Sequence, residues 1–203
     1  MVNDLSVEVN VLSNEMKFLI ELIRESDTEK ITLHEKRITE IDWDYFLKLA
    51  LHHRVYPLIY LKLRDHENRL VPSYIIQALQ QEYKKNTFQM LFLSKEMGEI
   101  SRCLDEKGIR SLFLKGPVIA HDLYGDISLR TSKDLDILIL KNDLEKSEKV
   151  LLKLGYEREV TSTVLNEQKW RHHHVVYFHP KKRLEIEIHW RLHPPPMKEP
   201  SFS

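Results

Sequence analysis

Cysteine is almost absent from this sequence, which contains only Cys103. A single cysteine excludes a disulfide within the chain and is typical of proteins from a reducing compartment. Nothing nearby marks Cys103 as an activated nucleophile, so we interpret it as a packed helix residue. An excess of charge is also lacking, because 31 lysines and arginines balance 31 aspartates and glutamates. This balance argues against a protein that binds nucleic acid through a global basic surface.

Long hydrophobic runs are missing as well. No apolar segment approaches the roughly 20 residues that a helix needs to cross a bilayer. The first six residues, Met-Val-Asn-Asp-Leu-Ser, include neither a basic nor an apolar region, so we expect no signal peptide. These absences predict a cytoplasmic protein without a membrane partner. With 203 residues, the chain can form one large domain or two small ones.

Helical periodicity dominates the first half of the chain. Apolar residues recur at helical spacing in residues 11–23 and 42–53, and Pro57 and Pro72 indicate the starts of two further helices. The helix that begins at Pro72 is long, and its apolar side broadens at residues 88–93. This breadth favours packing against a domain over a coiled coil.

The pattern changes near Gly108, where short apolar runs alternate with helical segments. Strands are expected at residues 109–114, 135–140, 156–160, 174–178 and 184–190. Helices are expected at 117–124 and 143–154, the second capped by Asn142. A mobile polar loop is expected at 161–171. The run Ile137–Leu140 is apolar throughout, which is typical of a central strand buried on both faces. We therefore predict an α+β fold with a helical region at residues 1–106, a small mixed-sheet core at 107–192 and a proline-rich tail at 193–203.

Three groups of polar residues stand out in the predicted core. Asp134 and Asp136 begin the central strand and point the same way, as two carboxylates that bridge metal ions would. Glu187 lies on the charged face of the last strand, which an antiparallel neighbour would bring beside them. Lys115 and Gly116 precede a helix that starts at a proline, and a helix N-terminus is a natural phosphate site. Taken singly, each group also fits an ordinary solvated strand or turn.

Histidines form a further group. Adjacent strand residues point to opposite faces, so of His172, His173 and His174 only the first and third could share a metal. No cysteine or acid stands at a familiar zinc spacing from them, which argues against a zinc site. Substrate contact or packing at the sheet edge is the favoured interpretation. His189 shares a face with Glu187 and could orient it, or could only pair with Glu185.

Taken in chain order, the glycine turn before a helix, the Asp-x-Asp strand and the acid on a later strand resemble the motifs of the DNA-polymerase-β-like nucleotidyltransferase superfamily. Within it, the chain is similar to a bacterial nucleotidyltransferase family marked by Leu-Lys-Gly, Arg-x-x-x-Asp-x-Asp and Glu-x-His-Trp. In this chain the three motifs are Leu114–Gly116, Arg130–Asp136 and Glu187–Trp190. The resemblance covers roughly residues 84–192 and implies a small mixed-sheet polymerase-β-like core.

The resemblance also implies a reaction: transfer of a nucleoside monophosphate from a nucleoside triphosphate to an acceptor, with release of pyrophosphate. The acceptor could be a small molecule, a sugar, a peptide, a protein or RNA. Two Mg²⁺ ions, or Mn²⁺ in their place, would be the cofactors. Asp134, Asp136 and Glu187 would hold the metals and act as the catalytic carboxylates. The triphosphate would contact Lys115, Gly116, Arg130 and Ser132.

Two departures from the superfamily pattern keep another hypothesis open. Pro117 replaces a common serine after the glycine, and the spacing from Gly116 to Asp134 is longer than usual. A catalytically inactive binding or regulatory module with the same fold is therefore the alternative. A helical nucleic-acid-binding protein is a weaker third interpretation, because basic residues are dispersed among acids.

Overall fold

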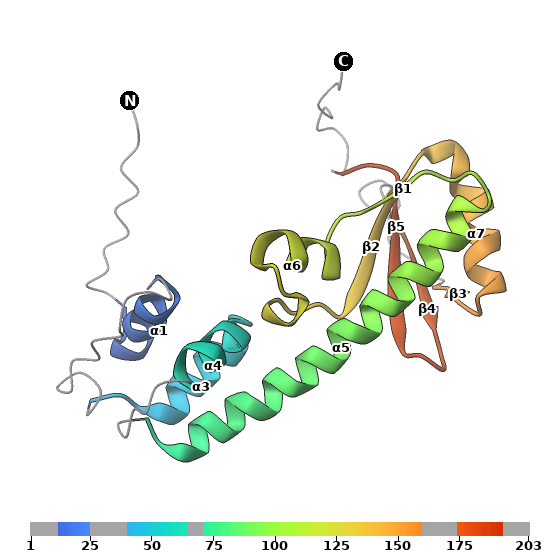
Figure 1. The fold of residues 1–203 in the computed structure, drawn as a ribbon. Helices are drawn as coiled ribbons and strands as arrows, with labels where there is room; N and C mark the ends of the chain where they lie inside the picture. The colour runs from blue at the N-terminus through green and yellow to red at the C-terminus, as the bar shows by residue number, and fades with distance from the viewer. Residues whose placement is uncertain (1–11, 25–39, 65–70, 160–173, 193–203) are drawn as a thin grey trace, which may run out of the picture. The chain divides into compact units, whose positions relative to one another are not determined.

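The computed structural model describes residues 12–24, 40–64, 71–159 and 174–192 (Figure 1). Its contacts divide the chain into two compact units. Described residues before Phe88, together with Ser128–Arg130, form the first unit, and the other described residues form the second. The division falls inside the longest helix, between Thr87 and Phe88. A change of domain at residue 106, as the sequence patterns suggest, stays a prediction.

The first unit is helical. Its elements are α1 (Asn14–Arg24), α3 (Trp43–His52), α4 (Tyr56–Arg64) and the first part of α5 (Ser73–Asp105). Apolar side chains at helical spacing make the core, where the rings of Phe18 and Phe46 pack with their centroids 5.4 Å apart. Asp42 caps α3, because its carboxylate accepts a hydrogen bond from the Tyr45 amide at 3.0 Å. The helices expected in this part of the chain are therefore present.

The second unit is built on a five-stranded mixed sheet. Its strands are β1 (Ser111–Phe113), β2 (Asp134–Ile139), β3 (Glu157–Arg158), β4 (His174–His179) and β5 (Leu184–His189), in the spatial order β1-β2-β5-β4-β3. Its helices are the second part of α5, α6 (Pro117–Tyr124) and α7 (Leu144–Lys153), and 3-10 turns precede β2 (Ile127–Leu129) and α7 (Lys141–Asp143). The α+β fold class is confirmed.

The direction of β5 corrects an expectation. We predicted an antiparallel neighbour for the Asp-x-Asp strand, but β5 runs parallel to β2. The chain turns back at the β4–β5 hairpin, whose strands are antiparallel, so β5 regains the direction of β2. The same order makes β5 the middle strand, whereas β2 lies between β1 and β5. The strand predicted to be central is therefore an inner strand beside the centre.

The two faces of the sheet differ in character. Leu135, Ile137 and Ile139 of β2 and Ile186 and Ile188 of β5 belong to one apolar core. This core includes Met90, Leu93, Ile100 and Leu104 of α5 and Val150 and Leu151 of α7. Because strand side chains alternate, the acids of β2 and β5 lie on the opposite face. The helices thus bury one face and leave the other for polar chemistry.

Several local expectations are wrong or lie outside the described residues. Asn142 does not cap α7, because the N-cap position is Asp143, which makes no capping hydrogen bond through its side chain. Phe88 and Leu91 are 73% and 53% exposed, so the apolar side of α5 is narrower there than its composition suggests. The loop expected at 161–171 is outside the described residues. No helix in the described ranges is long and apolar enough to cross a membrane.

Candidate active site

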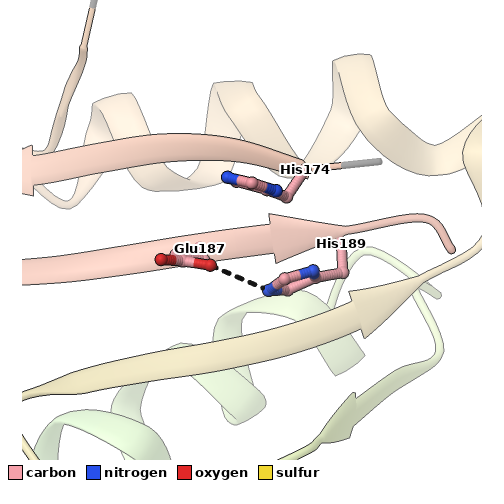
Figure 2. Close-up of side chains that lie close together, drawn as sticks. All are labelled: His174, Glu187 and His189. Atoms are coloured by element: carbon pink, nitrogen blue, oxygen red, sulfur yellow. Dashed lines mark ion pairs between the residues drawn. The ribbon is translucent and has the colours of Figure 1, made fainter. Parts of the chain in front are cut away.

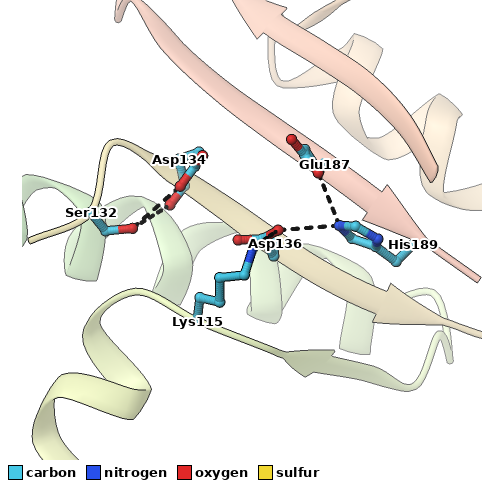
Figure 3. Close-up of polar contacts among 6 residues, drawn as sticks. All are labelled: Lys115, Ser132, Asp134, Asp136, Glu187 and His189. Atoms are coloured by element: carbon cyan, nitrogen blue, oxygen red, sulfur yellow. Dashed lines mark hydrogen bonds and ion pairs between the residues drawn. The ribbon is translucent and has the colours of Figure 1, made fainter. Parts of the chain in front are cut away.

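Asp134 and Asp136 stand at the beginning of β2, on the face opposite the core that β2 forms with α5 and α7 (Figure 3). The polar residues before Asp134 end the preceding turn, and the apolar run after it forms the buried part of the strand. Asp134 is partly exposed, whereas Asp136 is only 1% exposed. The two carboxylates predicted from the sequence therefore lie on one strand, with Asp134 partly exposed and Asp136 buried.

Strand β5 brings two more carboxylates level with them. In the parallel register, Asp134 is paired with Glu185 and Asp136 with Glu187. Asp134, Glu185 and Glu187 each offer an oxygen, and these oxygens lie within 4.8 Å of one another. Two of the three predicted acids, Asp134 and Glu187, therefore come together although they are distant in sequence, and Asp136 is the register partner of Glu187. An all-oxygen group of this size suits a hard cation such as Mg²⁺.

Asp136 is held by two nitrogen groups. The ammonium of Lys115 donates to its Oδ1 at 2.9 Å, and His189 Nε2 lies 3.2 Å from the same oxygen. Burial raises the pKa of Asp136, but the hydrogen bonds from His189 and Lys115 outweigh it and bring the pKa below its ordinary value. In return, the hydrogen bond to Asp136 raises the pKa of Lys115. Asp136 is therefore an ionised carboxylate inside the fold.

The second oxygen of Asp136 is the unusual one. Its Oδ2 is buried and has no hydrogen-bond partner among the described residues. An unpaired buried carboxylate oxygen is costly, so such an atom calls for a specific explanation. A bound cation would supply the missing partner. The residues of the site therefore fit a metal ion on an observation separate from the acid cluster.

His189 connects Asp136 to Glu187. Its Nε2 lies 3.1 Å from Glu187 Oε2 as well as close to Asp136. One imidazole nitrogen thus faces carboxylates on two strands, and the dashed lines of Figure 3 follow this chain of contacts. His189 is 8% exposed, which keeps the arrangement largely out of water. The orienting role that the sequence suggested for His189 agrees with this geometry.

The turn before α6 lies against the start of β2. Gly116 is the N-cap of α6 and has φ 74° and ψ −142°, a conformation that favours glycine. A Cβ at this position would come within 3.9 Å of the Asp134 carbonyl oxygen and of Ser132 Oγ. Pro117 occupies the first turn, where its missing N–H costs no helical hydrogen bond. The glycine turn therefore lies against the beginning of β2, beside Asp134.

Ser132 and Arg130 have different surroundings. Ser132 Oγ donates to the carbonyl and carboxylate of Asp134 at 3.2 and 3.3 Å, so it orients that residue. Arg130 is grouped with the helical unit, where its carbonyl accepts a hydrogen bond from Asn86. Its buried Nη1 has no hydrogen-bond partner within the described part of the chain. A role for either residue in binding triphosphate stays a prediction.

Glu185 is the site residue that the sequence reasoning left out. The alternation along β5 places it on the face of Glu187, but such alternation is equally typical of a half-buried strand with a solvated face. Burial raises the pKa of Glu185, and the charges of Glu187, Glu159 and Asp134 add to the effect. The signal in the sequence was Glu-x-Glu, which becomes informative only once β5 is known to pair with β2.

The other end of these strands has a different character. A hollow of about 450 Å³ is lined by Leu112, Leu140, Trp190 and neighbouring residues of β1, β2 and β5. The described residues that line it include no carboxylate. The acidic end of the sheet is therefore the place where metal-dependent chemistry is to be expected.

Comparison with known protein families gives a match over most of the chain. The model of the family described as uncharacterised nucleotidyltransferase matches residues 39–203. Searches of curated proteins and of solved structures each found no significant match. The matched region takes in most of the chain and includes both acidic strands, the glycine turn and the helices from α3 onward. On this coverage, the chain belongs to the uncharacterised nucleotidyltransferase family.

Proposed function

We propose that this protein transfers a nucleoside monophosphate from a nucleoside triphosphate to an acceptor hydroxyl or phosphate, in a metal-dependent reaction. The acceptor oxygen forms a bond to the α-phosphorus, the bond from that phosphorus to the bridging oxygen breaks, and pyrophosphate leaves. Membership of the nucleotidyltransferase family supports the reaction class. The acceptor is a small molecule, sugar, peptide, protein or RNA that the proposal leaves open.

The observation that carries the proposal is the environment of Asp136. Its buried Oδ2 has no hydrogen-bond partner among the described residues, while Oδ1 accepts from Lys115. Close by, Asp134, Glu185 and Glu187 offer three more carboxylate oxygens within 4.8 Å of one another. A structural role alone would not require four carboxylates here, because clustered acids repel one another in the folded protein.

Asp134, Asp136 and Glu187 would hold two Mg²⁺ ions, or Mn²⁺, with Glu185 as a further carboxylate within reach. When bound, the metal supplies positive charge that neutralises the phosphate oxygens and aligns the acceptor with the leaving group. The first two residues come from one strand and Glu187 from its parallel neighbour. Because β2 and β5 are hydrogen-bonded to each other, the distances between these carboxylates are kept nearly constant.

The protein's own side chains have distinct tasks under this proposal. Ser132 keeps Asp134 oriented through its hydrogen bonds to the carbonyl and carboxylate. His189 holds Asp136 and Glu187 at a fixed spacing. Lys115 neutralises Asp136 in the nucleotide-free protein, and its side chain is 56% exposed, so it can turn toward triphosphate oxygens. Glu187 accepts the proton of an acceptor hydroxyl.

The direct test is a search for labelled product. Wild-type protein, each labelled nucleoside triphosphate, Mg²⁺ and a cell extract are incubated together and separated by mass and charge. We expect one nucleotide to label one acceptor class, with no product from Asp136→Asn. Asp122→Asn, on the exposed surface of α6, serves as the matched control and should retain product formation. Equal labelling by wild type and Asp136→Asn would refute the proposed role of the carboxylates.

The rival candidate is a binding or regulatory module without turnover. One observation favours it, since Lys115 already places a positive charge on the Asp136 carboxylate. In such a module, the ammonium would permanently replace a metal ion. Product formation separates the two cases: the enzyme binds a nucleoside triphosphate with Mg²⁺ and forms product, whereas the module binds the nucleotide and forms none.

A further inference from the structure

We propose that His174, Glu187 and His189 form a second cation site, one that binds a transition-metal ion such as Zn²⁺. Each residue offers a ligand atom, and the three atoms lie within 4.8 Å of one another. Figure 2 shows the three side chains together on the same side of β4 and β5. The inference does not rest on the proposed nucleotidyl transfer, although the site shares Glu187 with the all-oxygen cluster.

The pairing of β4 with β5 creates this group. The two strands are antiparallel, and His174 is the register partner of His189. Their rings face each other with centroids 5.1 Å apart and an interplanar angle of 37°. Glu187 precedes His189 by two residues and therefore shares its face. Two imidazoles and a carboxylate are thus fixed by strand geometry, with little flexible backbone between them.

The spacing suits direct coordination. Ligand atoms about 2.0–2.2 Å from a tetrahedral zinc ion lie about 3.3 Å from each other. His189 Nε2 and Glu187 Oε2 are 3.1 Å apart, close to that separation before any ion is added. His174 and Glu187 are partly exposed, so an ion has access from solvent. Little rearrangement is then needed for binding, which favours affinity.

The ligand types define the class of ion. Imidazole nitrogen suits Zn²⁺, Cu²⁺, Ni²⁺ and Fe²⁺, whereas Mg²⁺ prefers oxygen ligands. The neighbouring cluster of Asp134, Glu185 and Glu187 offers oxygen alone. The structure therefore places a nitrogen-rich site beside an oxygen-only one, with Glu187 on the border. Three protein ligands also leave a fourth tetrahedral position for water or another small ligand.

Titration with Zn²⁺ alone, in a buffer that does not chelate metals, tests the site on the full chain. Calorimetry should show one tight event in wild type, and His174→Gln should weaken it by at least about tenfold, the lower end of what even outer-shell changes cost. His121→Gln, on the exposed surface of α6, is the matched control and should bind like wild type. Unchanged Zn²⁺ affinity in His174→Gln would overturn the proposal.

Two further measurements keep the test decisive. The stabilisation of His174→Gln by Mg²⁺ should equal that of wild type, because the oxygen-only cluster is intact in this variant. If His174→Gln does not fold, crystals of the wild-type protein soaked in Zn²⁺ answer the question through the anomalous signal of zinc. A peak between His174 and His189 supports the site, and a peak elsewhere with none there refutes it.

Discussion

Asp136→Asn tests the central feature of the candidate site, a buried carboxylate with one paired and one unpaired oxygen. The substitution preserves shape and removes the charge. Asparagine Oδ1 can still accept from Lys115 and His189, but hydrogen bonds to a neutral acceptor are weaker than those to a charged one by about 1 kcal/mol each. Asparagine Nδ2 would occupy the place of Oδ2, to which no described residue donates a hydrogen bond, and would put a buried donor where the native protein has a buried acceptor.

An unsatisfied buried donor costs about 1–3 kcal/mol. Relief of repulsion from Glu187 and Asp134 offsets part of these losses. We therefore expect the free energy of unfolding of the metal-free variant to be lower than that of wild type by about 2 kcal/mol. The larger effect concerns metal. At a Mg²⁺ concentration 100-fold above its dissociation constant, wild type gains about 2.7 kcal/mol. For a chain of this size that gain raises the melting temperature by about 5–10 °C.

Urea unfolding with chelator and with Mg²⁺ measures both quantities in one design. Asp136→Asn should lose the Mg²⁺-dependent gain, whereas Asp122→Asn on the exposed surface of α6 should keep it. An equal gain in wild type and Asp136→Asn would place the metal away from Asp136. A metal-free Asp136→Asn that is more stable than wild type would show that the contacts to Oδ1 do not offset the burial of charge.

Three other substitutions have defined outcomes. The pKa of Glu185 is raised above its ordinary value of 4.5, so the folded protein loses stability as the pH rises and Glu185 becomes ionised. Glu185→Gln should therefore raise the melting temperature of metal-free protein at pH 7 but not at pH 4. An equal change at both pH values would contradict an origin in the ionisation of Glu185. Lys182 pairs with Glu96, which is 2% exposed, so Lys182→Met should cost about 3 kcal/mol in urea unfolding, and Glu96→Leu added to it should recover much of the loss. Asn86 donates to the carbonyls of Ser128 and Arg130, so Asn86→Ala should cost about 1–3 kcal/mol, and a loss below 0.5 kcal/mol would show that water replaces these bonds.

Local patterns predicted the elements well. Helix α6 begins at Pro117 and ends at Tyr124, as the proline and the following glycine indicate. The helical spacing before residue 106 and the alternation in β5 also matched the observed elements. These features depend on residues near one another in sequence, where periodicity and turn chemistry decide the conformation.

Long-range pairing could not be read from the same patterns. The direction of β5 depends on the β4–β5 hairpin and on the chain between β2 and β4, and both orientations are compatible with the alternation of β5. The proximity of Glu185 to Asp134 follows from the parallel register alone. His174 and His189 are 15 positions apart in the sequence, a separation that matches no common spacing of metal ligands. They become neighbours only because β4 and β5 pair in this register. Such facts require tertiary structure.

The place of β5 in the sheet has a consequence for folding. Among the described strands β5 is last in sequence, yet it lies between β2 and β4. Until β5 is inserted, β2 and β4 have no hydrogen-bonded partner on their facing edges, and edges of this kind favour misassembly. Pairing β2 with β5 also closes a loop of about 50 residues, and contacts of such length slow folding. A chain interrupted before β5 would therefore carry Asp134 and Asp136 without a completed site, and would be prone to aggregate.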